Sequence, residues 1–283
     1  MAFGINAGIV PLLFLQVLYP QFFYPATILQ AWFWFAVIPL LLIAYYAMYL
    51  ASFGKFRVAA ALVATIFIYI IGLMFSSAMT LTANPQEWPE IFLGSQRGGA
   101  VHGFYFYFSA EVLLRFLLVV GMSFGTLAAY FAAGAEWFAG ETEYRNDLRR
   151  LVLLYLLGAV IYGAAGAIYA GSILAILPRL WFGIAGVSLI AGVLLSVAYW
   201  KKPRQATATA LIVAQLLVLA ANAIVRQWVQ FTELLEWYDP HQAPMRAEWG
   251  SLVFFIATLV IAVALIAWIG QVVLRRTRRS AVS

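Results

Sequence analysis

The first part of the chain contains an unusually long run without charge: from Gly4 to Gly54 there is no Asp, Glu, Lys or Arg. A membrane span needs roughly 20 mostly apolar residues to cross the hydrocarbon, so this run is too long for one helix. Proline removes a backbone donor and clashes with the preceding helical turn. Pro20 and Pro25 therefore predict a turn between two spans, Ile5–Tyr19 and Thr27–Phe53.

The apolar pattern continues to the C-terminus. The 283 residues are 65% hydrophobic and 10% charged, whereas soluble domains carry about 25% charged residues. We therefore predict an all-α integral membrane protein, a bundle of about eight transmembrane helices. It forms one polytopic domain over residues 1–283, with no separate soluble domain. The further spans are predicted at Val58–Thr82, Gly103–Ala133, Leu151–Leu177, Leu180–Trp200, Gln205–Trp228 and Gly250–Leu274.

Lys and Arg are unevenly divided between the two sides of these spans, and the cytoplasmic side normally holds the excess. The richer side holds Lys55, Arg57, Arg145, Arg149, Arg150, Lys201, Lys202, Arg204, Arg275, Arg276, Arg278 and Arg279. The other side holds Arg97, Arg179, Arg246 and, near the end of a span, Arg226. We predict that the richer side and both termini are cytoplasmic.

Net charge and cysteine content exclude several classes of function. The net charge is +6, but the basic residues lie in short clusters between apolar runs, which indicates topology and not nucleic-acid binding. Cysteine is absent. Its absence excludes disulfides, thiolate metal sites, Cys-ligated iron–sulfur clusters and haem attached through cysteine, and leaves non-covalent haem open. We predict no metal site.

The predicted outer loops are mildly acidic. They contain Glu87, Glu90, Glu233, Glu236, Asp239 and Glu248. A basic periplasmic electron carrier could dock there by electrostatic steering. The alternative is that these are ordinary solvated loops.

Glu111 and Arg115 are the strongest candidates for chemistry. They lie four residues apart and so share one helix face, near the middle of the predicted span Gly103–Ala133. Ionisable groups at that depth are costly and mark functional sites by default. They form either a proton relay facing a cofactor or a buried ion pair that fixes helix packing.

His102 begins the same predicted span at the outer interface. Histidine is a common haem ligand, so His102 is a candidate haem ligand or quinol contact; the alternative is an interfacial histidine without such a role. With Met74, Met79 or Met122 as second ligand, one haem b remains open.

Small and polar residues within the spans indicate helix packing. Small residues recur every four positions in two spans and allow close helix approach in lipid; they are Ala159, Gly163, Ala167 and Gly171, then Ser188, Gly192 and Ser196. The run from Gly121 to Gly125 matches the Gly-x-Ser-x-Gly pattern of serine hydrolases, but that motif needs a strand-to-helix turn. We interpret Gly121 and Gly125 as a packing face. Gln16, Gln30 and Gln215 are expected to bond neighbouring helices.

Three segments resemble an uncharacterised family of bacterial polytopic membrane proteins associated with c-type cytochromes and respiratory chains. They are Val10–Tyr19 followed by Gln21-Phe22-Phe23-Tyr24, Met79-Thr80-Leu81 through Pro85-Gln86-Glu87-Trp88, and Arg226-Gln227-Trp228. The family is distantly similar to subunit I of cytochrome bd quinol oxidases. The resemblance implies a location in the bacterial cytoplasmic (inner) membrane.

The sequence departs from the family pattern at two expected histidines. Where the family has Arg-Tyr-Leu-His, this chain has Arg115-Phe116-Leu117-Leu118, and Gln21 stands where another histidine is expected. If those histidines bind haem in relatives, this chain lacks both, and His102 is the candidate replacement.

The resemblance implies an integral membrane subunit of a multi-subunit respiratory electron-transfer complex. It would anchor redox subunits, among them c-type cytochromes or other periplasmic redox proteins, and contribute to a quinone or quinol site without being the catalytic subunit. One alternative is a haem b-bearing quinol oxidoreductase subunit, with His102 as ligand and Glu111 as proton acceptor. Another is a small-solute or ion transporter that uses Glu111, Arg115 and Asn222.

Overall fold

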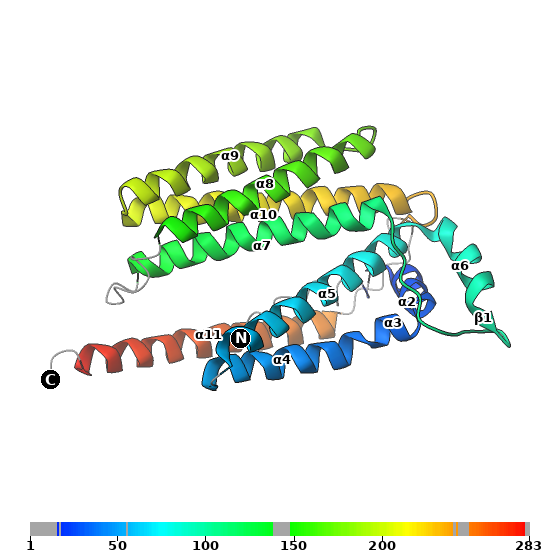
Figure 1. Ribbon diagram of the computed structural model, residues 1–283, viewed down its shortest axis with the longest axis horizontal. Coiled ribbons are helices and arrows are strands. Elements are labelled where there is room, and N and C mark those ends of the chain that lie inside the picture. Colours follow the sequence, from blue (N-terminus) through cyan, green and yellow to red (C-terminus); the bar gives the residue numbers. More distant parts are fainter. Residues whose placement is uncertain are drawn as a thin grey trace. The chain divides into compact units, whose positions relative to one another are not determined.

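The computed structural model describes residue 16 and residues 18–54, 56–137, 148–239, 242 and 249–280. The chain divides into two compact units, Met1–Tyr238 and Asp239–Ser283, and each is described by itself. The prediction of a helical fold is confirmed, and six helical segments in the described residues are long and apolar enough to cross a membrane. They are Trp32–Phe53, Arg57–Ala83, Ala110–Trp137, Arg149–Ser172, Arg179–Lys201 and Gln205–Leu234 (Figure 1). Most of the predicted span Ile5–Tyr19 lies outside the described residues.

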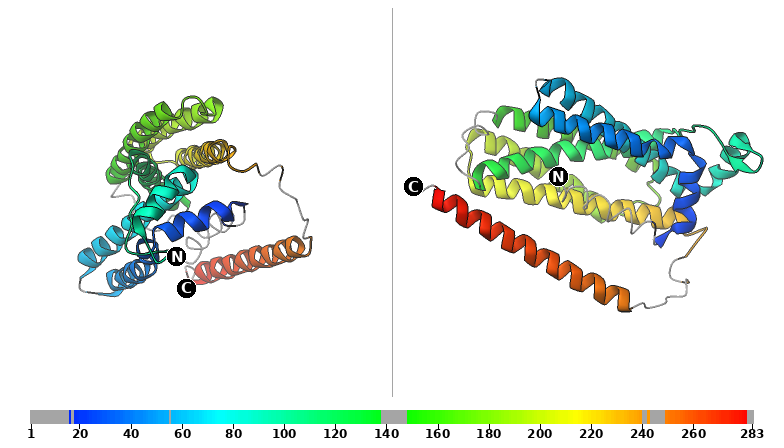
Figure 2. Two further views of the ribbon diagram at one scale, coloured as in Figure 1. Left: turned by 90° about the vertical axis from the view of Figure 1, so that its right-hand side faces the viewer. Right: turned by 90° about the horizontal axis from the view of Figure 1, so that it is seen from below.

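Four of these helices form a bundle within the first unit. They are α7 (Ala110–Trp137), α8 (Leu148–Ser172), α9 (Arg179–Lys201) and α10 (Gln205–Leu234). Each packs against the next, and α10 closes the ring by packing against α7, as the views in Figure 2 show.

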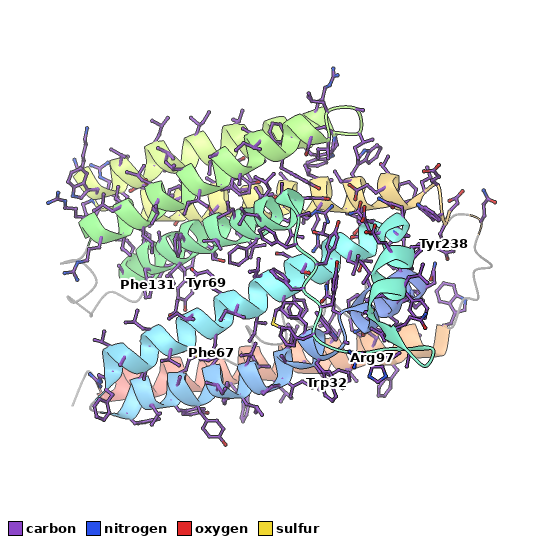
Figure 3. All side chains as sticks on the ribbon, turned by 45° about the vertical axis from the view of Figure 1, so that its right-hand side comes forward. Trp32, Phe67, Tyr69, Arg97, Phe131 and Tyr238 are labelled. Carbon is purple, nitrogen blue, oxygen red and sulfur yellow. The ribbon has the colours of Figure 1, made fainter. Side chains whose placement is uncertain are left out.

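A second layer lies beside α7. Helix α5 (Arg57–Ala83) packs against α7 on one side and against α4 (Val37–Phe53) on the other. Tyr69 of α5, labelled in Figure 3, makes edge contacts with the rings of Phe116 and Phe124 on α7, at centroid distances of 6.3 and 6.5 Å.

Helices α7 and α8 approach most closely at glycines. A Cβ atom added to Gly158 would lie 2.6 Å from the carbonyl oxygen of Gly121 and 2.8 Å from the backbone nitrogen of Gly125. No side chain fits there, because atoms that close would overlap. The prediction that Gly121 and Gly125 form a packing face is confirmed, and the Gly-x-Ser-x-Gly run lies inside a helix.

One end of the bundle is filled by small side chains and a polar network. Buried alanines of α7 pack there against Tyr155, Tyr199 and Leu211. The Tyr155 hydroxyl donates to Oε1 of Gln215 at 3.0 Å, and Gln215 donates to Thr126 at 3.1 Å. The expectation that Gln215 bonds neighbouring helices is confirmed, and its contacts join α10 to α7 and α8.

Short elements gather at the opposite end, where α7 begins (Figure 1). They are α2 (Pro20–Leu29), α3 (Trp32–Phe35), the 3-10 helix η1 (Pro85–Glu87), α6 (Trp88–Ser95) and an antiparallel hairpin of β1 (Gln96–Arg97) and β2 (Ala100–Val101). The turn predicted between Pro20 and Pro25 is wrong: both prolines lie in α2, Pro20 in its first turn, where no intrahelical donor is needed.

Two predicted spans begin too early, for one shared reason. The backbone of residues 30–32 pairs with that of residues 103–105: the N–H of Trp32 donates to Gly103 at 3.1 Å, and that of Tyr105 donates to Gln30 at 3.4 Å. Ala31 takes a left-handed φ of 48° at this point. The pairing ends α2 before Trp32 and keeps the residues before Ala110 extended, so Thr27 and Gly103 do not begin spans.

Other helix ends also differ from the predicted bounds. Helix α8 ends at Ser172 and not at Leu177, and α10 continues past Trp228 to Leu234. The second unit contains α11 (Trp249–Ser280), which extends beyond the predicted Leu274. The extension of α10 brings Glu233, predicted to be a loop residue, into a helix.

Candidate functional site

An ion-pair cluster centred on Arg115 joins two helices of the bundle. Its Nη2 lies 2.5 Å from Oε1 of Glu111 on the preceding turn of α7 and 3.3 Å from Oε2 of Glu233 on α10. The side chains are 15% exposed for Arg115, 27% for Glu111 and 21% for Glu233. One guanidinium thus serves two partly buried carboxylates.

Tyr169 brings a third helix into this cluster. Its hydroxyl donates to Oε1 of Glu111 at 3.4 Å, from the last turn of α8. The guanidinium carbon of Arg115 lies 5.6 Å from the centre of the Tyr169 ring, within the range of a cation–π contact. Helices α7, α8 and α10 therefore meet through four polar side chains.

The depth predicted for Glu111 and Arg115 is wrong. Because α7 begins at Ala110 and not at Gly103, Glu111 is its second residue and Arg115 its sixth. At about 1.5 Å of rise per residue, both lie within the first two turns. Glu233 stands in the last turn of α10. The cluster therefore lies at the helix ends and not at mid-span.

A second polar pair lies deeper on the same side of the bundle. The Tyr162 hydroxyl of α8 donates to Oδ1 of Asn222 on α10 at 3.2 Å. Arg226 follows Asn222 by one helical turn. Within the described residues, Arg226 has no carboxylate at ion-pairing distance, and its side chain is exposed.

A pocket of about 720 Å³ lies between these groups. Arg115, Arg226, Tyr162, Tyr169, Asn222, Gln227 and Gln230 supply its polar wall. Side chains of α5, α7 and α9, among them Phe75, Met79, Leu118, Met122 and Phe182, supply its apolar walls. Clefts of this size, mostly apolar and with a few convergent polar groups, are typical of small-molecule sites.

The small residues of α8 and α9 make room for this pocket. Gly163, Gly166, Ala167 and Ala170 of α8 line it, as do Ala185 and Gly186 of α9. The sequence predicted that the small residues of these two spans would form a tight packing face. That holds at Gly192, where a Cβ would overlap the Tyr155 ring. Toward the Arg115 end, small residues leave open space instead.

The structure does not bring His102 to this pocket. His102 follows β2 on an exposed segment, and its backbone N–H donates to Ser95 at 3.2 Å. Met79 and Met122 line the pocket and Met74 is buried, but His102 does not belong to the lining. In the described part of the chain, no group of three or more His, Asp or Glu side chains could hold a metal ion.

The sequence analysis missed three members of the site: Glu233, Tyr162 and Tyr169. A signal for Glu233 was present, since Asn222, Arg226, Gln230 and Glu233 recur at intervals of four, four and three residues and so share a helix face. The tyrosines gave no such signal, because a tyrosine in an apolar span is equally suited to packing.

Comparisons with known proteins add no identification. No protein-family model, no curated protein and no solved structure matches this chain.

Proposed function

We propose that this chain is an integral membrane subunit of a respiratory electron-transfer complex and that its pocket binds a lipid-soluble quinol or quinone. The observation that carries the binding site is at Arg115. It lines the pocket together with Asn222 and Arg226, and these side chains bring N–H donors to its wall. A quinone oxygen is a suitable acceptor for such donors, and the apolar walls suit a hydrocarbon tail.

The respiratory part of the proposal is supported by the resemblance at Val10–Tyr19, Met79–Trp88 and Arg226–Trp228. We further propose eight spans in the bacterial inner membrane, which add Ile5–Tyr19 and α11 to the six helical segments above. Both termini are then cytoplasmic, and the Arg115 cluster lies near the outer face. Partner c-type cytochromes or other periplasmic redox proteins would dock on that side.

The first test is purification in mild detergent, followed by a subunit inventory, solvent extraction of quinones and a reduced-minus-oxidised visible spectrum. The proposal expects redox subunits to co-purify and quinone to be retained. It also expects Gly186→Leu to lose the quinone, because Gly186 lines the pocket and a Cβ there meets nothing within 4 Å.

Gly183→Leu is the matched control. Gly183 lies one turn earlier on α9, a Cβ there also meets nothing within 4 Å, and it does not line the pocket. A chain that retains neither quinone nor partner subunits contradicts the proposal. Haem b bands that persist in the isolated chain and vanish in His102→Ala would support a haem-bearing subunit instead.

A further inference from the structure

Arg226 is a cation in a membrane-spanning helix without a counter-charge of its own. Two carboxylates at this end of the bundle, Glu111 and Glu233, both pair with Arg115. Among the described residues, nothing neutralises Arg226 in the same way. A charge within a span is costly unless it is paired or reaches water, so the position requires either a route to water or an anionic partner.

The position of Arg226 along α10 limits its route to water. Leu234, at the end of the helix, lies eight positions further along, which is about 12 Å at the α-helical rise. The side chain lines the pocket together with Asn222 on the preceding turn and Gln230 on the following one. These three groups offer hydrogen-bond donors on one face of α10, toward a space whose other walls are mostly apolar apart from Arg115, Tyr162 and Tyr169.

We propose that the pocket binds an acidic amphiphile, with its carboxylate or phosphate on Arg226 and its hydrocarbon tail along the apolar walls of α5, α7 and α9. An Arg–carboxylate or Arg–phosphate pair is the charge-assisted contact that a guanidinium makes best. The inference rests on the proposed function in one respect, that the pocket takes an amphiphile. It adds the chemical class of the head group. A quinol and the acidic amphiphile would then compete for the same pocket.

The test uses the full chain in nanodiscs of uncharged phosphatidylcholine. The probes share one diazirine-bearing tail and differ in head group: a fatty acid, the matching fatty alcohol, a lysophosphatidic acid and a short-chain quinone with the same label. Intact-mass spectrometry measures the labelled fraction after photolysis. The two acidic probes distinguish a free fatty acid from a phospholipid-derived head group as the preferred source.

The fatty acid or the lysophosphatidic acid is expected to label the wild-type chain about tenfold more than the alcohol does, the ratio that one charge-assisted contact supplies. Arg226→Gln is expected to remove that preference, and Arg226→Lys to keep much of it. Arg97→Gln is the control, because Arg97 is exposed on the hairpin and does not line the pocket (Figure 3). Gly186→Leu is expected to lower labelling by all probes, whereas Gly183→Leu is not.

Equal labelling of the wild-type chain by acid and alcohol overturns the inference, and this comparison needs no variant to fold. A preference that survives in Arg226→Gln overturns it as well. If the quinone or the alcohol labels the chain, Gly186→Leu blocks that labelling and the acids label no better, the result supports an amphiphile pocket. It then contradicts only the acidic head group. If Gly186→Leu changes no probe, both the pocket and the acidic head group fall.

Discussion

Arg115 contacts carboxylates from two helices, and its contribution to stability depends on both. Glu111 and Glu233 lie 2.5 and 3.3 Å from the same guanidinium nitrogen. Removing the cation would leave two partly buried carboxylates facing each other. Removing either carboxylate leaves the other contact in place. The arrangement therefore predicts unequal effects of substitutions within one cluster.

Arg115→Leu is expected to destabilise the folded protein by about 2–4 kcal/mol, somewhat below the usual cost of breaking a fully buried pair because water reaches part of each group. Glu111→Gln is expected to cost less, since Glu233 still pairs. Thermal unfolding in detergent, followed by intrinsic fluorescence, measures the difference. The triple variant Arg115→Leu, Glu111→Gln, Glu233→Gln should recover part of the loss; a triple variant less stable than Arg115→Leu alone would contradict this account.

At the residue scale, the sequence predicted one half of this cluster. The spacing of Glu111 and Arg115 is local and can be read from one helix. Glu233 lies 118 positions from Arg115, and no local rule relates the two. Depth was misjudged for a similar reason: the start of α7 depends on backbone pairing with residues 30–32, which a hydropathy pattern does not contain.

At the element scale, the α7–α8 contact is set by backbone and not by side chains. Gly158 faces the carbonyl of Gly121 and the amide of Gly125, so the helix axes are fixed at a distance that admits no side chain. The sequence predicted Gly121 and Gly125 as packing residues, but it could not identify Gly158 as their partner. Small residues recur on many faces of these helices, and only the fold selects which of them meet.

Gly158→Ala is expected to lower stability by about 1–3 kcal/mol, the range for inserting a methyl group into a packed contact. Gly171→Ala on the same helix is the control, because a Cβ there meets nothing within 4 Å. That change is expected to be neutral or to stabilise by about 0.5–1 kcal/mol, since alanine favours the helix. Equal thermal midpoints for the two variants would contradict the glycine contact.

For the whole molecule, the bundle has two unlike ends. Alanines, tyrosines and Gln215 fill one end, whereas the pocket and the Arg115 cluster occupy the other. The sequence predicted a helical membrane protein, because a chain this rich in hydrophobic residues is suited to lipid and not to water. It could not predict which end is filled and which holds the pocket, since alanine and glycine occur both in tightly packed contacts and along the pocket wall.

The proposed orientation predicts a labelling pattern that the absence of native cysteine makes simple to read. Gln96→Cys lies on the exposed hairpin and should react with a membrane-impermeant maleimide in intact spheroplasts. Gln205→Cys, exposed at the start of α10, and Ser283→Cys should react only after permeabilisation. The reverse pattern at all three positions would invert the orientation. Reaction of Ser283→Cys in intact spheroplasts, with Gln96→Cys and Gln205→Cys reacting as expected, would change the number of spans.

The hollow end of the bundle also governs how the protein behaves outside its membrane. The pocket of about 720 Å³ is mostly apolar and partly open to its surroundings, and apolar surface that faces water costs roughly 25 cal/mol per Å². In a membrane, lipid chains cover such walls, and in detergent the detergent chains take their place. A detergent is therefore a temporary ligand as well as a solvent, and we expect its chain length to change how long the purified protein survives.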